Sequence, residues 1–266
     1  MNLFKASKRK LPIGEAAHLF LNILLAVAVF ALVYIGDSAI FGALGLVLLS
    51  KWRIFAVRPR YWWANILANI VDVTVSLGVV SLLYLAGTAD KYGLELQVGI
   101  TAFYILWLVI IKPRSKRFWV ILQAGLALSL GTWALAALSH EVYLLVAVLG
   151  FYVVGLGVAR HILASFEEDE MSLMSMIFGL LLAEFGWLIY HWNVAYSLKF
   201  LGDFKIPQIS IISLAFGLCI YSLFTAARSG KTAKLFSGEV VAPVLFSVAI
   251  IVVIISFFSS NGPGII

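Results

Sequence analysis

Long apolar runs separated by short polar segments repeat along the whole chain. A bilayer's hydrocarbon core of about 30 Å needs about twenty residues of helix, whose backbone hydrogen bonds are satisfied internally. The pattern predicts an all-α fold, a polytopic helical transmembrane bundle of about nine spans, with the N-terminus inside and the C-terminus outside. The predicted spans cover residues 16–35, 39–57, 62–86, 97–111, 118–138, 141–159, 172–192, 207–227 and 239–258. We interpret residues 1–266 as a single integral membrane domain.

The second run is the least regular, because Lys51 and Arg53 interrupt it after about a dozen apolar residues. The positive-inside rule decides whether it crosses. With nine spans, sixteen of the nineteen lysines and arginines lie on the inner side. Without the second span the count becomes seven inside and twelve outside. We therefore predict that this run crosses the membrane.

Composition supports a membrane protein, since 63% of residues are hydrophobic, 12% are charged and the mean hydropathy is +1.05. Soluble domains are about half apolar and a quarter charged. The net charge of +6 is explained by basic inner loops that face anionic lipid, and we expect no nucleic-acid partner. We expect a multi-pass protein of the cell (cytoplasmic) membrane. Membrane protein partners or a homo-oligomer are further candidates.

Two predicted inner turns resemble each other, at residues 57–62 and 111–119. Both contain a proline and cations, and both are followed by an aromatic pair. A duplicated hairpin in parallel orientation, as in transporters, explains this likeness. We favour the alternative, in which any inner turn between two spans acquires the same proline, cations and aromatic pair without a duplication. The candidate contacts to lipid headgroups are Arg58, Arg60, Lys112, Arg114, Lys116 and Arg117.

A polar stripe crosses the third predicted span around Asp72. Asn65, Asn69 and Ser76 lie at helical spacings from Asp72, which places all four on one face. An ionisable residue at membrane depth is a candidate functional site with a partner to be named, and we name Lys51. The alternative, which we favour slightly, is a buried pair that only holds two helices together.

A second carboxylate, Glu184, lies near the centre of the seventh predicted span. Trp187 and His191 follow at spacings of three and seven, so the three side chains share a face that runs to the outer surface. Glutamate and histidine on one face are suited to carrying protons. The alternative places His191 in the outer aromatic belt and bonds Glu184 to a neighbouring helix.

Other chemistry finds little support in the chain. The start of the first span carries a small stripe of His18 and Asn22, and the four histidines lie at different depths, so we expect no metal site. No phosphate-binding loop, nucleophile elbow or zinc-protease motif is present, and we predict no catalytic residue and no cofactor. Glycines suited to close helix contact occur at positions 42, 45, 150, 155 and 157.

Two polar segments remain. We interpret the acidic run at 167–170 as the solvated start of the seventh span, with a docking site for a basic partner or a divalent cation as the alternative. We expect the outer connection from Asn193 to Pro207 to lie on the outer leaflet as an amphipathic segment. A more specific and less favoured interpretation is that this segment caps a cavity beside His191.

Three functions fit these features. The leading hypothesis is a small proton- or cation-coupled transporter or channel that uses Asp72 and Glu184. The second is a non-catalytic membrane scaffold or complex subunit that binds partner proteins or anionic lipid. The weakest is a lipid-modifying membrane enzyme with one of the carboxylates as general base, so the sequence favours a non-enzyme.

Overall fold

The computed structural model describes residues 13–36, 39–89, 92–197, 204–228, 242, 245–250, 253 and 264–265. Within these residues, seven helices are long and apolar enough to cross a membrane. The helical elements are α1 (Ile13–Ile35), α2 (Ile40–Ser50), η2 (Trp52–Ile54), η3 (Pro59–Tyr61), α3 (Trp62–Gly87), α4 (Gly93–Leu106), the π-helical η4 (Trp107–Ile111), α5 (Arg117–Ala137), α6 (Leu144–Ala164), α7 (Met171–His191) and α8 (Gln208–Arg228). The prediction of a helical membrane-type bundle is confirmed at this level.

The second predicted span differs from the sequence-based expectation. Instead of a continuous helix over 39–57, α2 ends after eleven residues and a 3₁₀ turn follows at Trp52–Ile54. At 1.5 Å per residue, α2 is only about 16 Å long, roughly half of the hydrocarbon thickness. Residues 239–258 lie mostly outside the described residues. The nine crossings and the orientation therefore stay predictions.

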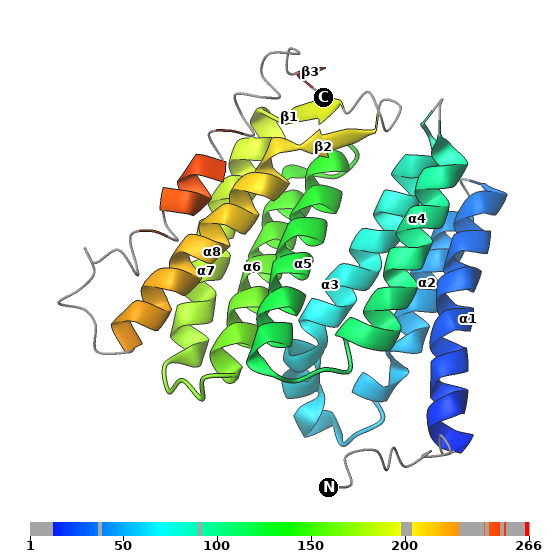
Figure 1. Cartoon of the computed structure of the whole chain (residues 1–266), viewed down its shortest axis with the longest axis horizontal. Helices are drawn as coiled ribbons and strands as arrows, with labels where there is room; N and C mark the ends of the chain where they lie inside the picture. The colour runs from blue at the N-terminus through cyan, green and yellow to red at the C-terminus, as the bar shows by residue number, and fades with distance from the viewer. Residues whose placement is uncertain are drawn as a thin grey trace, which may run out of the picture.

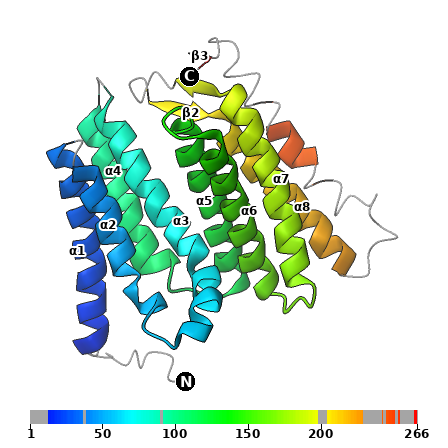
Figure 2. The ribbon, with the colours of Figure 1, turned by 180° about the vertical axis from the view of Figure 1, so that it is seen from behind.

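Helix α3 occupies the centre of the bundle, where it contacts α1, α2, α4, α5 and α6. Figure 1 shows α1, α2 and α4 gathered on one side of α3 and α5 to α8 on the other, and the view from behind in Figure 2 shows the same order. Valines from α3 form much of the buried core, including Val75, Val79 and Val80. A polar residue on the buried face of α3 therefore lies deep inside the protein.

Helices α6 and α7 approach each other through glycines. A Cβ atom added at Gly155 would lie 3.0 Å from the Cα of Gly179, and one at Gly186 would lie 2.9 Å from the Cβ of Phe151. Small residues allow such close backbone approach in membrane bundles. The predicted helix contact at Gly155 is present, as are those at Gly150 and Gly157, whereas a Cβ atom added at Gly45 would meet nothing within 4 Å.

A small antiparallel sheet covers the end of the bundle opposite the start of α1 (Figure 1). Strand β1 (Val194–Ser197) pairs with β2 (Lys205–Pro207) and with β3 (Gly264–Ile265). The connection from Asn193 to Pro207 thus carries paired strands on both sides of residues 198–203, which lie outside the described residues. The amphipathic segment on the outer leaflet stays a prediction. The strands form because the backbone N–H and C=O groups beyond the helix end need hydrogen-bond partners. The β-branched and aromatic residues of this segment also favour strands.

The acidic run lies at the other end of the bundle, between α6 and α7. Glu168 forms an ion pair with Arg228 at the end of α8, and Arg228 also donates a 2.7 Å hydrogen bond to the carbonyl of Phe166. One carboxylate of the run therefore connects two helix ends within the chain. This contact gives the acidic run a structural role.

Candidate functional site

Asp72 lies on the buried face of α3, ten residues after Trp62 and about 15 Å along the helix. The Asp72 side chain is 11% exposed, and the other buried residues of α3 around it include Val71, Val75 and Ser76. The Ser76 hydroxyl donates back to the Asp72 carbonyl at 2.8 Å, which satisfies the serine within the helix. Burial of an ionised carboxylate at this depth requires charged or polar partners.

Lys51 supplies the first partner. It follows directly after the last residue of α2, and its ammonium group donates a hydrogen bond to Oδ2 of Asp72. The Lys51 side chain is 7% exposed, so both members of the ion pair are withdrawn from solvent. Because α2 ends at Ser50, Lys51 lies inside the bundle at the level of Asp72. The pairing of Lys51 with Asp72 predicted from the sequence is confirmed.

A π-helical turn at Trp107–Ile111 supplies two further partners. The Trp107 indole donates to Oδ1 of Asp72 at 3.3 Å, and the Lys112 ammonium lies 2.8 Å from Oδ2. In an α-helix, residues five apart point about 140° away from each other. The π turn, marked by the 2.8 Å bond from the Lys112 amide to the Trp107 carbonyl, turns both side chains toward Asp72.

Gln123 on α5 holds the end of this turn in place. Its amide nitrogen donates to the carbonyls of Ile111 at 2.7 Å and Arg114 at 2.9 Å, and its amide oxygen lies 2.9 Å from Nε2 of His161 on α6. Carbonyls at a helix end have no partner within the helix. One buried side chain therefore satisfies the end of the segment that carries Lys112.

We expect Gln123→Met to lower the free energy of unfolding by about 1–2 kcal/mol, because it leaves partly buried carbonyls without a donor. Gln123→Glu also lacks the amide donor and should destabilise the protein similarly. The measurement is reversible unfolding in mixed detergent micelles followed by tryptophan fluorescence. A stable Gln123→Glu variant beside an unstable Gln123→Met variant would show that the bond to His161, not the carbonyl contacts, matters.

The ion-paired Asp72 borders an open cavity of about 920 Å³ between α1, α2, α3 and the end of η4. The polar and charged residues of its lining come from α1, the end of α2, η2, α3 and the segment after η4: His18, Asn22, Ser50, Lys51, Arg53, Asn65, Asn69, Asp72 and Lys112. The remaining wall is mainly apolar and includes leucines of α1 together with Leu46 and Leu108. The cavity thus leads from the start of α1 to a buried cluster of charged groups, and we call it the Asp72 cavity.

The chain matches no protein-family model, and no curated protein or solved structure is similar enough to indicate a family. Functional inference therefore rests on the Asp72 cavity and on the other chemical features of the described residues.

The predicted polar stripe lies where the sequence indicated. Asn65 and Asn69 are half-buried and line the Asp72 cavity. Their amide nitrogens donate to the backbone, from Asn65 to Ile54 at 3.4 Å and from Asn69 to Asn65 at 2.8 Å. The His18 and Asn22 stripe of α1 faces the same cavity, with the two side chains 3.3 Å apart. The polar stripes of α1 and α3, which the sequence analysis treated separately, thus line the same cavity.

The six lipid-headgroup candidates separate into three groups. Lys112 turns inward to Asp72, a role that the sequence did not reveal. Three arginines instead lie over aromatic rings at 4.1 to 4.6 Å: Arg60 over Tyr61, Arg114 over Trp119 and Arg117 over Phe166. Arg58 and Lys116 are exposed at the same end of the bundle. Headgroup binding by these residues stays a prediction.

Glu184 belongs to a different part of the molecule. It is exposed on α7, which contacts α6 and α8, whereas Asp72 is buried on α3. Trp187 and His191 share its exposed face, with their rings 4.9 Å apart. The structure therefore does not bring the two intramembrane carboxylates together in one site.

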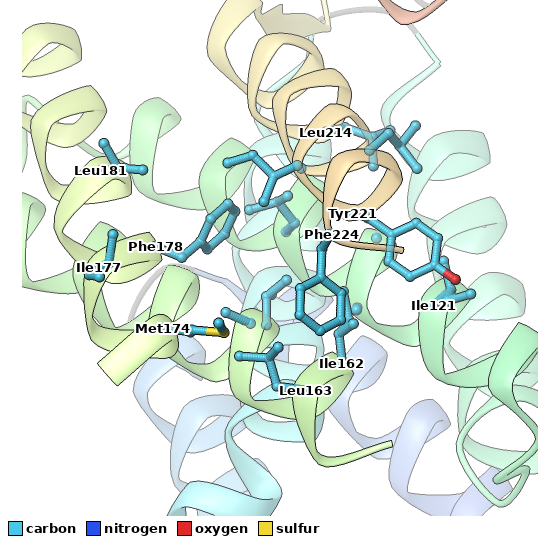
Figure 3. A pocket seen from close by; sticks show the side chains of 18 residues that line it. Ile121, Ile162, Leu163, Met174, Ile177, Phe178, Leu181, Leu214, Tyr221 and Phe224 are labelled. Carbon is cyan, nitrogen blue, oxygen red and sulfur yellow. The ribbon is translucent and has the colours of Figure 1, made fainter. Parts of the chain in front are cut away.

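A second cavity, of about 230 Å³, lies between α5, α6, α7 and α8 (Figure 3). Figure 3 shows Phe178, Leu181, Leu214 and Phe224 around it, and its lining is apolar apart from the hydroxyl of Tyr221. An apolar cavity of this kind offers no group for ion binding or catalysis. Of these two cavities, the Asp72 cavity is the candidate functional site.

Proposed function

We propose that this protein is a small membrane transporter or ion-conducting protein whose solute or ion site is the Asp72 cavity. The observation that carries the proposal is a buried carboxylate, shared by two lysines, at the end of an open polar cavity. Ionisable groups at membrane depth that face a cavity are typical of transport pathways.

The break after α2 supports the same function. Discontinuous helices that end near mid-membrane form the binding sites of many transporters, because their ends leave backbone and side-chain groups for a ligand. Here α2 ends at Ser50, and Lys51 at its carboxyl end complements the negative end of the helix dipole.

The ion pair suggests how coupling would work. Binding of a proton or a cation at Asp72 would neutralise the carboxylate and release Lys51 and Lys112 from it. Loss of those contacts would loosen the connection between α2, α3 and η4. Asp72 is therefore proposed as the coupling residue, and Glu184 with His191 as a separate proton pathway on α7.

The test is a flux assay on purified protein in liposomes under proton, sodium and potassium gradients. We expect Asp72→Asn to abolish flux, because an amide cannot exchange a proton or attract a cation. Glu184→Gln should reduce flux only if α7 carries part of the pathway. Absence of wild-type flux under every gradient, with folded variants, would remove the transport proposal.

A scaffold or complex subunit is the second candidate, and the exposed face of α7 favours it. Leu173, Ile177, Leu180, Glu184 and Trp187 are exposed at alternating spacings of four and three residues. This spacing is that of a helix–helix seam, and a glutamate facing lipid is costly. Gentle extraction followed by native mass spectrometry should then recover a stable complex that Glu184→Leu changes.

A further inference from the structure

The charges that line the Asp72 cavity do not balance. Among the lining residues that the structure describes, Lys51, Lys112 and Arg53 are cationic and only Asp72 is anionic. Counted over lysine, arginine and aspartate, the lining therefore carries two net positive charges. Excess positive charge in a partly desolvated site is unfavourable unless an anion is present.

The two lysines have hydrogen-bonding capacity beyond Asp72. An ammonium group has three donors. Within the described part of the chain, the polar contact recorded for each ammonium goes to the same atom, Oδ2 of Asp72. Both ammonium groups are thus held side by side at the cavity wall by one carboxylate oxygen. Two neighbouring ammonium groups are suited to binding the oxygens of a carboxylate or phosphate group.

The rest of the lining indicates what the anion would be attached to. Leu21, Leu24 and Leu25 of α1, with Leu46 and Leu108, form an apolar wall near the lysines. Asn65 and Asn69 lie on the α3 side. A volume of about 920 Å³ is far larger than an inorganic ion needs and lies in the range of pockets for small organic molecules.

We propose that the Asp72 cavity binds an organic anion, with its carboxylate or phosphate group at Lys51 and Lys112 and its apolar part against α1. This assignment names the ligand class of the cavity on which the proposed function rests. The ligand would be either a water-soluble organic anion or an anionic amphiphile that enters from the membrane, since both present the same chemistry.

The test is isothermal titration of the purified full chain in a neutral maltoside detergent. The probes are octanoate for the soluble source, lysophosphatidic acid for the membrane source, and octyltrimethylammonium as a cation of similar apolar size. We expect saturable binding of at least one anion and none of the cation. The anion that binds identifies the source.

Two variants locate the binding site. Lys112→Gln removes one ammonium group at a position whose side chain is 38% exposed, so folding should tolerate it. We expect it to weaken anion binding about tenfold, the value of one charge-assisted hydrogen bond. Arg160→Gln on α6 makes the same charge change outside the cavity lining and should leave the affinity unchanged.

Failure of both anions to bind the wild type, or equal weakening by Lys112→Gln and Arg160→Gln, would overturn the proposal. These outcomes are separate from those of the flux assay. Anion binding without flux would retain the ligand class and remove the transport function. Flux that depends on Asp72, in a protein that binds neither anion, would retain the transport function and remove the ligand class.

Discussion

Asp72→Leu should lower the free energy of unfolding by about 3–5 kcal/mol, the largest effect we expect from a single substitution in this protein. The reason is Lys51, whose side chain is 7% exposed and whose charge would be left buried without the Asp72 carboxylate. The Trp107 indole would also lose its acceptor. Reversible unfolding in mixed detergent micelles, followed by circular dichroism, measures the change.

The double variant Lys51→Met/Asp72→Leu separates the cost of an unpaired charge from the value of the pair. Replacing both members of a buried ion pair by apolar residues is often neutral or stabilising. We therefore expect the double variant to recover most of the lost stability. Lys112→Met is the matched control and should cost much less than Lys51→Met, because the Lys112 side chain reaches solvent. A double variant as unstable as Asp72→Leu would contradict this explanation.

Gly155→Leu should destabilise the bundle by about 3 kcal/mol, because the new side chain has no room between α6 and α7. Already its Cβ would lie 2.9 Å from the Cβ of Leu182 and 3.0 Å from the Cα of Gly179. Backbone atoms cannot give way as a flexible side chain does, so the two helices would have to separate. The same unfolding measurement reports the loss.

Gly99→Leu on α4 is the control for this prediction. Gly99 is helical and exposed, and a Cβ there would meet nothing within 4 Å. Leucine has a much better helix propensity than glycine, so we expect a small gain of up to about 1 kcal/mol. Equal losses in the two variants would mean that the α6–α7 contact is not the cause.

Helix positions could be predicted well from the sequence, because they depend on local hydropathy. The predicted spans 62–86, 118–138, 172–192 and 207–227 agree with α3, α5, α7 and α8 to within one residue at each end. At the second run the apolar pattern stops at Lys51, where α2 ends, and it was the charge count that led us to extend the predicted helix to residue 57. Hydropathy gave no indication of the strands after α7, since pairing depends on segments far apart in the chain.

Part of the candidate site could also be predicted from local sequence. Asp72 and Lys51 could be paired because helical counting places both at comparable depth. Lys112 was assigned to the headgroups, because nothing in the sequence marks the π turn that directs it inward. A single shifted hydrogen bond leaves the apolar pattern of the segment unchanged, so only the folded structure reveals it.

Local hydropathy was enough to predict where the helices lie and at what level along them Asp72 and Glu184 are found. Which helices are neighbours side by side became clear only from the fold. It separated Asp72 from Glu184, which hydropathy places at similar depths, and it turned Lys112 toward Asp72. The physical reason is that hydropathy reports transfer from water to lipid, whereas the neighbours of each helix are chosen by close contact and ion pairing between helices.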